Sequence, residues 1–316
     1  MTLGVVDPGF LTTVQDLGRT GQQRFGVPVS GAMDRLALIA ANFLVGNIPS
    51  AAGLEAALVG PAFQAQDDCL VAAAGVGAGL EVEGQLLPMW MAAFVRRGWQ
   101  VRLVCRPEGG WAYLAAAGGL DLPLVMGSRS TYLRGSFGGV SGRRLRSGDS
   151  LPVGLVEPGR FLLAGQSLSA AYRPLYCDSP RVAVLPGPQQ EAFTAQGIAA
   201  FFNSSYRIRA DSDRMGYRLQ GTPVEHTRAA DIISQGQAQG AVQVPADGQP
   251  LVAMSDHQTT GGYTQIAVVA SADLPLLVQC PFESGEVRFY PTTLEEAQAR
   301  YRRLVWGLRE GMLGLD

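Results

Sequence analysis

Short runs of apolar residues, separated by glycine and proline, recur along most of the chain. Runs of four to six apolar residues bounded by turn residues are typical of buried β-strands. The pattern therefore predicts an all-β or β-rich barrel or sandwich. The runs lie at Cys69–Ala74, Gly79–Val82, Val101–Cys105, Trp111–Ala116, Phe161–Ala164, Val182–Leu185, Ala241–Val244, Leu251–Met254, Ile266–Val269 and Leu276–Cys280.

Two stretches show helical spacing instead. Ser30 is expected to cap a helix whose apolar face extends over residues 36–44 and which ends at Gly46. A second helix is expected near Pro188–Phe202, because proline is tolerated in the first turn of a helix.

A third and clearer helix follows Thr293. Thr293-Leu294-Glu295-Glu296 forms a capping box, in which the Thr293 hydroxyl accepts from the Glu296 amide while the Glu296 side chain reaches back. The apolar stripe beyond it predicts a helix that docks against this chain. Its members are Leu294, Ala297, Tyr301, Leu304, Val305 and Leu308.

A break in the pattern lies near Ser167–Pro180. Arg173-Pro174 and Ser179-Pro180 interrupt regular structure there, because a residue before proline is restricted to extended conformations. We therefore expect an N-terminal β-rich barrel domain, residues 1–175, and a C-terminal barrel domain, residues 176–316, that ends in the docking helix.

The composition excludes several kinds of chemistry. The chain has 316 residues, 16% of them charged, and a formal net charge of −2, and every one of its 25 basic residues is arginine. Without lysine it can form no Schiff base, no lysine-containing phosphate loop and no covalent biotin attachment. The near-neutral charge gives no electrostatic reason to expect nucleic acid as a partner.

The cysteines and the N-terminus indicate the compartment. Cys69, Cys105, Cys177 and Cys280 form no Cys-x-x-Cys pair and have no histidine at ligand spacing, so neither a metal site nor a redox motif is expected. The first residues lack the features of a signal peptide, and no apolar run reaches the ~20 residues of a membrane span. We expect reduced thiols and a cytoplasmic protein.

The most polar loop between two apolar runs spans Met254–Tyr263. Six successive side chains, Ser255–Thr260, can form hydrogen bonds, and Gly261-Gly262 lets the backbone approach a ligand or turn sharply. Such a loop can bind a small polar amide or a carboxylate. The alternative is an ordinary hairpin loop, since Asp, Thr and Gly all favour turns.

Two further polar clusters could bind an anion. Arg214 and Arg218 in Arg209–Arg218 could present planar forks to a carboxylate or phosphate, although alternating acids and arginines usually form a solvated, salt-bridged surface. Glycine amides beside Arg129 in Gly127–Tyr132 could also cradle an anion. By contrast, Gly75–Gly79 is followed by a strand-like alternation, so it predicts a turn between strands and not a dinucleotide loop.

Seven ordered motifs together give the chain a family resemblance. It closely resembles the biotin-dependent carboxyltransferase family known as allophanate hydrolase subunit 2, or KipA/PxpC, from about residue 3 to about residue 310. The motifs are Thr13–Arg19, Gly26–Asp34, Ala41–Asn47, Gly127–Tyr132, Ser212–Leu219, Gly240–Pro245 and Asp256–Tyr263.

This resemblance implies a mainly β fold with two cyclophilin-like β-barrel domains and a few short helices. It implies one component of a larger assembly, like the C subunit of the ATP-dependent 5-oxoprolinase, which opens pyroglutamate to glutamate together with the A and B subunits. Two alternatives stay open. One is the carboxyltransferase component of a urea-carboxylase-like enzyme, and the other is a regulatory KipA-like protein that antagonises a kinase inhibitor.

Within that framework the polar residues take expected roles. Asp256 is the candidate acid or base, and Gln258, Thr259 and Tyr263 would orient the amide. No metal is expected, ATP would act in the assembled complex, and any biotin would arrive on another protein. The expected partners resemble the A and B subunits of 5-oxoprolinase, and the B-like (KipI-like) protein would bind through an interface beyond ~1,200 Å². The residues expected to bind substrate or an anion are Arg129, Ser130, Asp213, Arg214, Arg218 and Gln243.

Overall fold

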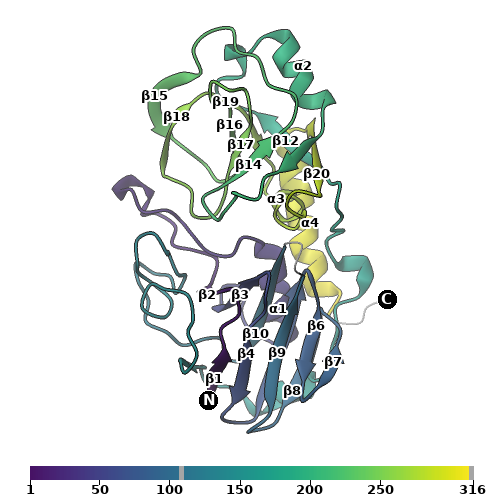
Figure 1. The fold of residues 1–316 in the computed structure, drawn as a ribbon. Helices are drawn as coiled ribbons and strands as arrows, with labels where there is room; N and C mark the ends of the chain where they lie inside the picture. Colours follow the sequence, from purple (N-terminus) through teal and green to yellow (C-terminus); the bar gives the residue numbers. More distant parts are fainter. Residues whose placement is uncertain (107–109, 313–316) are drawn as a thin grey trace. The chain divides into compact units, whose positions relative to one another are not determined.

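A computed structural model describes residues 1–106 and 110–312 (Figure 1). The chain folds into two compact units. Unit 1 comprises Met1–Arg19, Ser30–Pro174 and Leu304–Asp316, and unit 2 comprises Thr20–Val29 and Leu175–Arg303.

Unit 1 is built from two antiparallel sheets. Within the described residues, the strands of each sheet form an open row with two edges, not a closed ring. The six-stranded sheet has the order β11 (Ser150–Pro152), β1 (Thr2–Asp7), β4 (Ala62–Ala65), β9 (Gln100–Cys105), β6 (Gly77–Val82) and β7 (Gln85–Leu87). The five-stranded sheet has the order β2 (Leu11–Gln15), β3 (Gly53–Ala57), β10 (Trp111–Ala116), β5 (Cys69–Gly75) and β8 (Met91–Val95).

The core of unit 1 lies around the centre of the five-stranded sheet. Every residue of β5 and of β10 is buried, and helix α1 (Arg35–Leu44) packs against both strands. The expectation that Ser30 caps this helix is wrong. The Asp34 side chain accepts from the amide of Ala37, whereas Ser30 has a left-handed backbone with φ +57°. A capping residue needs an extended backbone, which Asp34 has.

Unit 2 is built around one closed barrel of seven strands. Strands β12 and β20 pair in parallel, and the other neighbours pair antiparallel. Strands β15 (Asp231–Gly236) and β18 (Thr260–Tyr263) form a separate two-stranded sheet, which we call the arm. Around the barrel the order is β12 (Arg181–Pro186), β19 (Gln265–Val269), β16 (Ala241–Gln243), β17 (Leu251–Ala253), β14 (Gly216–Gln220), β13 (Tyr206–Ile208) and β20 (Glu286–Pro291).

Helix α2 (Ala195–Asn203) is shorter than the sequence predicts. It begins after Thr194, whose hydroxyl accepts from Gly197, and the residues before it form a 3₁₀ turn, η4 (Gln190–Ala192). The prediction of a helix start near Pro188 is therefore wrong by about two turns. The other 3₁₀ turns are η1 (Gln23–Phe25), η2 (Pro158–Leu163) and η3 (Ala170–Tyr172).

Helix α4 (Leu294–Glu310) confirms the predicted capping box. The Glu296 amide donates to the Thr293 hydroxyl at 3.2 Å, and the Glu296 carboxylate accepts from the Thr293 amide at 3.5 Å. Ala297 packs in a buried cluster with Ala183 and Ala270. Leu294 is 52% exposed, so its place in the predicted apolar stripe is wrong.

The mainly β fold with a few helices is confirmed, and one closed barrel is present. Gly75 ends β5 and Gly77 begins β6, so only Val76 lies between the two strands. The segment joins two strands as predicted, but it is shorter than the predicted turn. Two apolar runs are not strands. Phe161–Ala164 overlaps η2, and Leu276–Cys280 overlaps α3 (Leu274–Val278).

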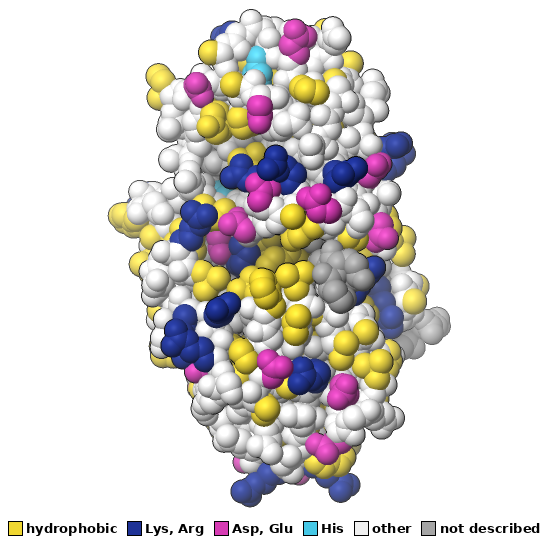
Figure 2. Space-filling model, viewed as in Figure 1, with side chains coloured by type: hydrophobic (Ala, Val, Ile, Leu, Met, Phe, Trp, Pro, Cys, Tyr) yellow, Lys and Arg dark blue, Asp and Glu magenta, His cyan; other side chains and the backbone are white. Residues whose placement is uncertain are grey.

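Neither a membrane-spanning helix nor, on the face of Figure 2, a large patch of one charge is found in the described residues. No helix in the part of the chain that the structure describes is long and apolar enough to cross a membrane. On the face that Figure 2 shows, arginine and acidic side chains are interspersed, and no extended patch of one sign is visible.

Candidate functional site

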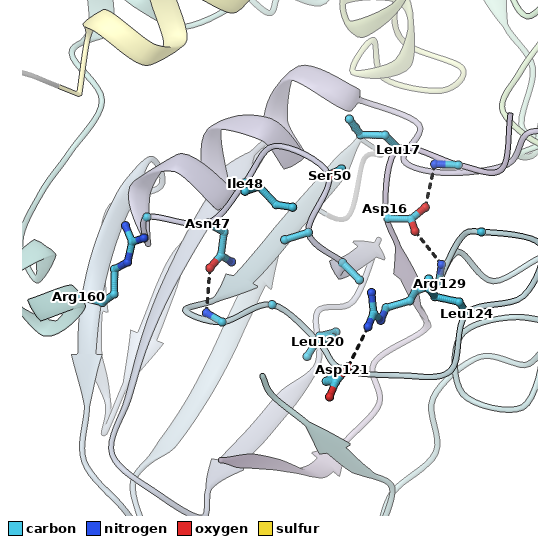
Figure 3. Close-up of a pocket in the computed structure, with 17 residues that line it drawn as sticks. Asp16, Leu17, Asn47, Ile48, Ser50, Leu120, Asp121, Leu124, Arg129 and Arg160 are labelled. Carbon is cyan, nitrogen blue, oxygen red and sulfur yellow. Dashed lines mark hydrogen bonds and ion pairs between the residues drawn. The ribbon is translucent and has the colours of Figure 1, made fainter. Parts of the chain in front are cut away.

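Three of the sequence motifs meet at a pocket in unit 1. The pocket has a volume of about 450 Å³ and is lined by parts of Thr13–Arg19, Ala41–Asn47 and Gly127–Tyr132, together with residues 118–121 and Arg160. Figure 3 shows these segments, which are far apart in the sequence, around one hollow. We call it the Asp16 pocket.

Asp16 is the organising group of this pocket. Its carboxylate accepts from the Ser128 hydroxyl, the Arg129 amide and the Gly18 amide, each at 2.7 Å, and also from the Ser130 hydroxyl. A carboxylate with this many donors is fixed in one orientation. Ser130, predicted to bind an anion, is buried and its hydroxyl holds Asp16.

Arg129 reaches the pocket from the same loop. Its Nε donates to the Leu122 carbonyl at 2.7 Å, and its Nη2 donates to the Asp121 carboxylate at 2.8 Å. Asp121 is 64% exposed. The guanidinium is thus held by the Leu122 carbonyl and by Asp121, and both Arg129 and Asp121 line the pocket (Figure 3).

The Asn47 side chain joins two segments that line the Asp16 pocket. Its side chain donates to the Ala116 carbonyl at 2.8 Å and to Asn42 Oδ1 at 3.0 Å, and accepts from the Gly118 amide at 2.8 Å. These bonds tie residues 46–52 to residues 116–121, so both walls of the pocket are held in place by one amide side chain.

The polar loop of unit 2 contains a buried ion pair. Arg214 Nε and Nη2 donate to the two oxygens of Asp256 at 2.8 and 3.1 Å, and both side chains are 6% exposed. The pair closes one end of the β14–β17 ladder, since the Asp256 amide also donates to the Arg214 carbonyl at 2.8 Å. The structure therefore brings two predicted residues together as partners of each other.

Gln243 and Gln265 each carry a buried amide nitrogen that lacks a partner. They are register neighbours on β16 and β19 and are 5% and 3% exposed. Among the described residues, neither Nε2 has a hydrogen-bond partner. A Cβ at Gly261 would lie 2.2 Å from Gln243 Nε2, so glycine in the Gly261-Gly262 pair leaves room for this amide. Buried donors without acceptors are rare in native proteins and mark places where a ligand or water binds.

The other predicted residues of unit 2 lie nearer the surface. Gln258 is exposed, Thr259 is half-buried and Tyr263, at the end of the arm, is 38% exposed. The Asp213 carboxylate accepts from the Met215 and Gly216 amides, and Arg218 pairs with Asp211 at 3.6 Å on the surface. Arg129 and Ser130 belong to unit 1, so the predicted residues are divided between the units.

His257 lies in the same loop but is buried. Its Nδ1 donates to the Gln258 carbonyl at 2.6 Å, and burial lowers the pKa of the imidazole from its usual value. In the described residues, no group of three or more His, Cys, Asp and Glu side chains could hold a metal ion.

Sequence reasoning missed several of the residues that form these sites. Asp16 and Asn47 lie inside motifs that carry the family resemblance, so that signal was available. Gln265 and Arg160 lie in no motif, and only the folded chain brings them to Gln243 and Gly46.

Comparison with known proteins gives a consistent result. Residues 25–291 match the family described as carboxyltransferase domain, subdomain A and B. The C subunit of 5-oxoprolinase from Escherichia coli (strain K12) is 37% identical, over 97% of this chain and 98% of that protein. The C subunit of 5-oxoprolinase from Haemophilus influenzae is 34% identical, over 95% of this chain and 94% of that protein.

A solved structure supports the same relationship. The crystal structure of the K. lactis urea amidolyase superposes on this chain with a TM-score of 0.89 at 28% identity. The match covers 100% of this chain but 20% of the urea amidolyase, so this chain spans about a fifth of that protein.

Proposed function

The chain belongs to the family of the carboxyltransferase domain, subdomains A and B, and we propose that it is the C subunit of an ATP-dependent 5-oxoprolinase. The observation that carries the proposal is the match to two bacterial C subunits over nearly the full length of both chains. With A-like and B-like partner proteins it would open 5-oxoproline, a cyclic amide, to glutamate.

The reaction needs activation of a stable amide. One water supplies the oxygen that adds to the lactam carbon, the ring C–N bond breaks, and the ring nitrogen takes up a proton and becomes the amino group, while a second water accepts the γ-phosphoryl group of ATP to give ADP and phosphate. The chain has no lysine for a phosphate loop, which supports ATP binding mainly by the partners. What this chain would contribute is recognition of the amide.

We propose that the lactam carbonyl binds at Gln243 and Gln265 in unit 2. Two amide donors without protein acceptors can both donate to one carbonyl oxygen, and they stabilise the negative charge that develops on it. Tyr263, Gln258 and Thr259, in or beside the arm, would orient the ligand. Asp256 would serve as acid or base with Arg214 as its fixed partner.

The remaining expectations stay proposals of the same kind. We propose that Asp213, Arg218, Arg129 and Ser130 contribute to binding of substrate or anion, the last two through the Asp16 pocket. We propose two domains, residues 1–175 and 176–316, and a cyclophilin-like type for the closed barrel of the second. The free thiols are compatible with a cytoplasmic location.

The test is reconstitution of the three proteins with defined variants of this chain. We expect glutamate release to require all three, and Gln243→Met to lower kcat/KM for 5-oxoproline by about tenfold, because a lost hydrogen bond to developing charge costs at least that factor. Stability should not fall, since methionine removes a buried amide nitrogen that has no partner.

Gln249→Met is the matched control. Gln249 also lies in unit 2, but its amide both accepts from and donates to the Gly221 backbone. This variant should lower stability and leave kcat/KM unchanged. Full activity without the chain, or equal kinetics for both variants, would contradict the proposal.

A second function is favoured by the family itself. The family model describes a carboxyltransferase domain, and the superposed structure is a urea amidolyase. In that case a biotinylated carrier would bring the carboxyl group, because this chain has no lysine to hold biotin. Carboxylation of urea by the chain with a biotin carboxylase and carrier, without glutamate release, would support this alternative over the first.

We also propose a stable complex with the B-like (KipI-like) protein. Trp90 and Trp111 are buried in unit 1, whereas Trp306 is 59% exposed and could anchor an interface. Co-expression and size-exclusion chromatography should give one complex. Replacing Trp306 by serine should weaken that complex, and separate elution of the wild-type chains at micromolar concentration would contradict it.

A further inference from the structure

A second pocket of unit 1 has a strongly basic lining. It has a volume of about 760 Å³, which is the size of a ligand pocket. Among the described residues that line it, Arg143, Arg144 and Arg146 are charged and none is acidic. A pocket whose lining bears one sign of charge raises the local concentration of ligands of the opposite sign. We call it the Arg144 pocket.

Arg143 is already paired with an acid, and this pair fixes the loop. Its two Nη atoms donate to the two oxygens of Asp149 at 2.7 and 2.8 Å, and the Asp149 side chain is 13% exposed. The same carboxylate accepts from the Arg146 amide at 2.8 Å, and the Leu145 amide donates to the Thr12 carbonyl at 2.9 Å. The backbone that carries the arginines is therefore held in place before any ligand binds.

Arg144 and Arg146 extend from this loop on the same side. Leu145 between them is 2% exposed, whereas both arginines are exposed. This alternation is that of an extended chain, in which residues two apart lie about 7 Å from each other on one side. Among the ion pairs of the described residues, neither arginine takes part in one. One acid for three arginines leaves two positive charges at the pocket.

The opposite wall of the pocket is apolar. Phe10 lines it together with Pro8 and Leu133, and the Phe10 side chain is 56% exposed. The Phe10 amide donates to the Val59 carbonyl at 3.0 Å, and a Cβ at Gly9 would lie 2.2 Å from that oxygen, so the turn that presents the ring needs glycine. An exposed aromatic ring beside positive charges offers a packing surface to a flat organic group.

The charged part and the apolar part lie within reach of one small molecule. Arg144 Nη1 donates to the Phe10 carbonyl at 3.5 Å, so the guanidinium lies beside the residue that carries the ring. A guanidinium has five N–H donors, and this one long contact leaves most of them for a ligand. An anion bound to Arg144 therefore also lies next to the apolar wall.

These features favour a phosphate ester over other anions. A phosphate monoester carries close to two negative charges at pH 7 on one group with three acceptor oxygens, which matches two arginines on neighbouring positions. A carboxylate carries only one charge, and inorganic phosphate would leave the apolar wall unused. We infer that the Arg144 pocket binds an organic phosphate, with its phosphate on Arg144 and Arg146 and a flat organic group against Phe10. This inference does not depend on the proposed reaction.

Calorimetry on the purified full-length chain, without partner proteins, tests the inference. Phenyl phosphate is the probe. Inorganic phosphate, which lacks the ring, and benzoate, which has a carboxylate in place of the phosphate, are the matched analogues. We expect both analogues to bind about tenfold more weakly or worse, because each lacks one part of the recognition. AMP carries the same phosphate monoester, and binding at least as tight as that of phenyl phosphate would identify the ligand as a nucleotide, whereas weaker binding would assign a smaller ester.

Variants link the binding to the pocket. Arg144→Gln and Arg146→Gln should each weaken phenyl phosphate by about tenfold. Phe10→Ala should weaken phenyl phosphate by about fivefold and leave inorganic phosphate unchanged. Arg96→Gln, at an exposed arginine of the same unit that stacks on Trp99 outside the pocket lining, is the control and should bind normally. Thermal unfolding of each variant checks that it is folded.

The outcomes are distinct from those of the activity assay. No binding of phenyl phosphate at millimolar concentration, or equal binding of benzoate and phenyl phosphate, would overturn the inference. Unchanged binding in both arginine variants would place the ligand elsewhere, and a matching loss in Arg96→Gln would indicate a general effect of charge; either result would also overturn it. Failure to reconstitute 5-oxoprolinase activity leaves these results unaffected, since the binding is measured on this chain alone.

Discussion

The buried pair of Arg214 and Asp256 should be the most sensitive electrostatic contact in unit 2. Replacing Asp256 by asparagine keeps the shape but removes the carboxylate charge that faces the Arg214 guanidinium, which is 6% exposed. Removing one member of a buried pair costs about 3–5 kcal/mol. The loss should be large because two hydrogen bonds, at 2.8 and 3.1 Å, join the groups and few water molecules can replace them.

The double variant separates the pair from its individual members. Arg214→Met with Asp256→Leu removes both charges, and such replacements of buried pairs are often neutral for stability. We therefore expect the double variant to be more stable than Asp256→Asn. In a double-mutant cycle with the single variants Arg214→Met and Asp256→Leu, the coupling energy should be about 3 kcal/mol. An additive double variant would show that the two side chains do not act as a unit.

The loss of stability in these variants should be located in unit 2, where both side chains lie. Arg214 precedes β14 and Asp256 follows β17, and these strands pair from Gly216↔Ala253 onward. Urea unfolding followed by circular dichroism gives the free energy, and hydrogen exchange of β14 and β17 locates the change. A loss below ~1 kcal/mol in Asp256→Asn is the size of an exposed pair and would refute the assignment of a desolvated one.

Three more predictions concern other groups. Burial lowers the pKa of His257, so the folded chain binds this proton less readily than the unfolded chain, and stability should fall as the pH drops below about 6.5; the difference between the urea midpoints of the wild type and His257→Gln should be constant above that pH and change below it, and a constant difference throughout would contradict this. Cys177 is exposed, while burial raises the pKa of Cys69, Cys105 and Cys280 to about 12; intact-mass analysis should show one alkylation by iodoacetamide in the native chain, and modification of a second thiol before unfolding would contradict this. Thr293→Ala removes the acceptor for the Glu296 amide and should lower stability by about 0.5–2 kcal/mol, with faster exchange of that amide as the specific sign of a lost cap.

The strands were predictable because the core of each unit is made of short apolar segments. All of Cys69–Ala74 and Trp111–Ala116 is buried, so a continuous apolar run carried the signal. The two failures share a cause. Phe161–Ala164 follows Pro158, and Leu276–Cys280 follows Pro275. In both cases the proline lies in the first turn of a helical segment. A proline before an apolar run should therefore have favoured a helix start over a strand.

The start of α1 could not be read from residue types alone. Ser30 and Asp34 are both good capping residues, and both precede the apolar face. The choice depends on the backbone, because Gly31 packs against residues 16–18, where a Cβ would lie 2.8 Å from the Gly18 amide nitrogen. This close approach, between segments of different motifs, turns the chain at Ser30 and leaves Asp34 as the first residue with capping geometry.

The polar sites were only partly predictable, because some of their contacts join residues that are far apart in the sequence. A loop such as Met254–Tyr263 has its polar groups next to one another in sequence, so a single sequence shows them, although the pairing of Asp256 with Arg214 is a long-range contact. The Asp16 pocket has the opposite character. Arg160 meets Gly46 through a missing side chain, and Asn47 joins two walls through backbone atoms. Contacts made through a glycine or through backbone atoms do not require a particular residue type at the position that is contacted, so the sequence does not reveal them. We therefore expect sites of this kind to be underestimated whenever function is inferred from polar side chains in one sequence.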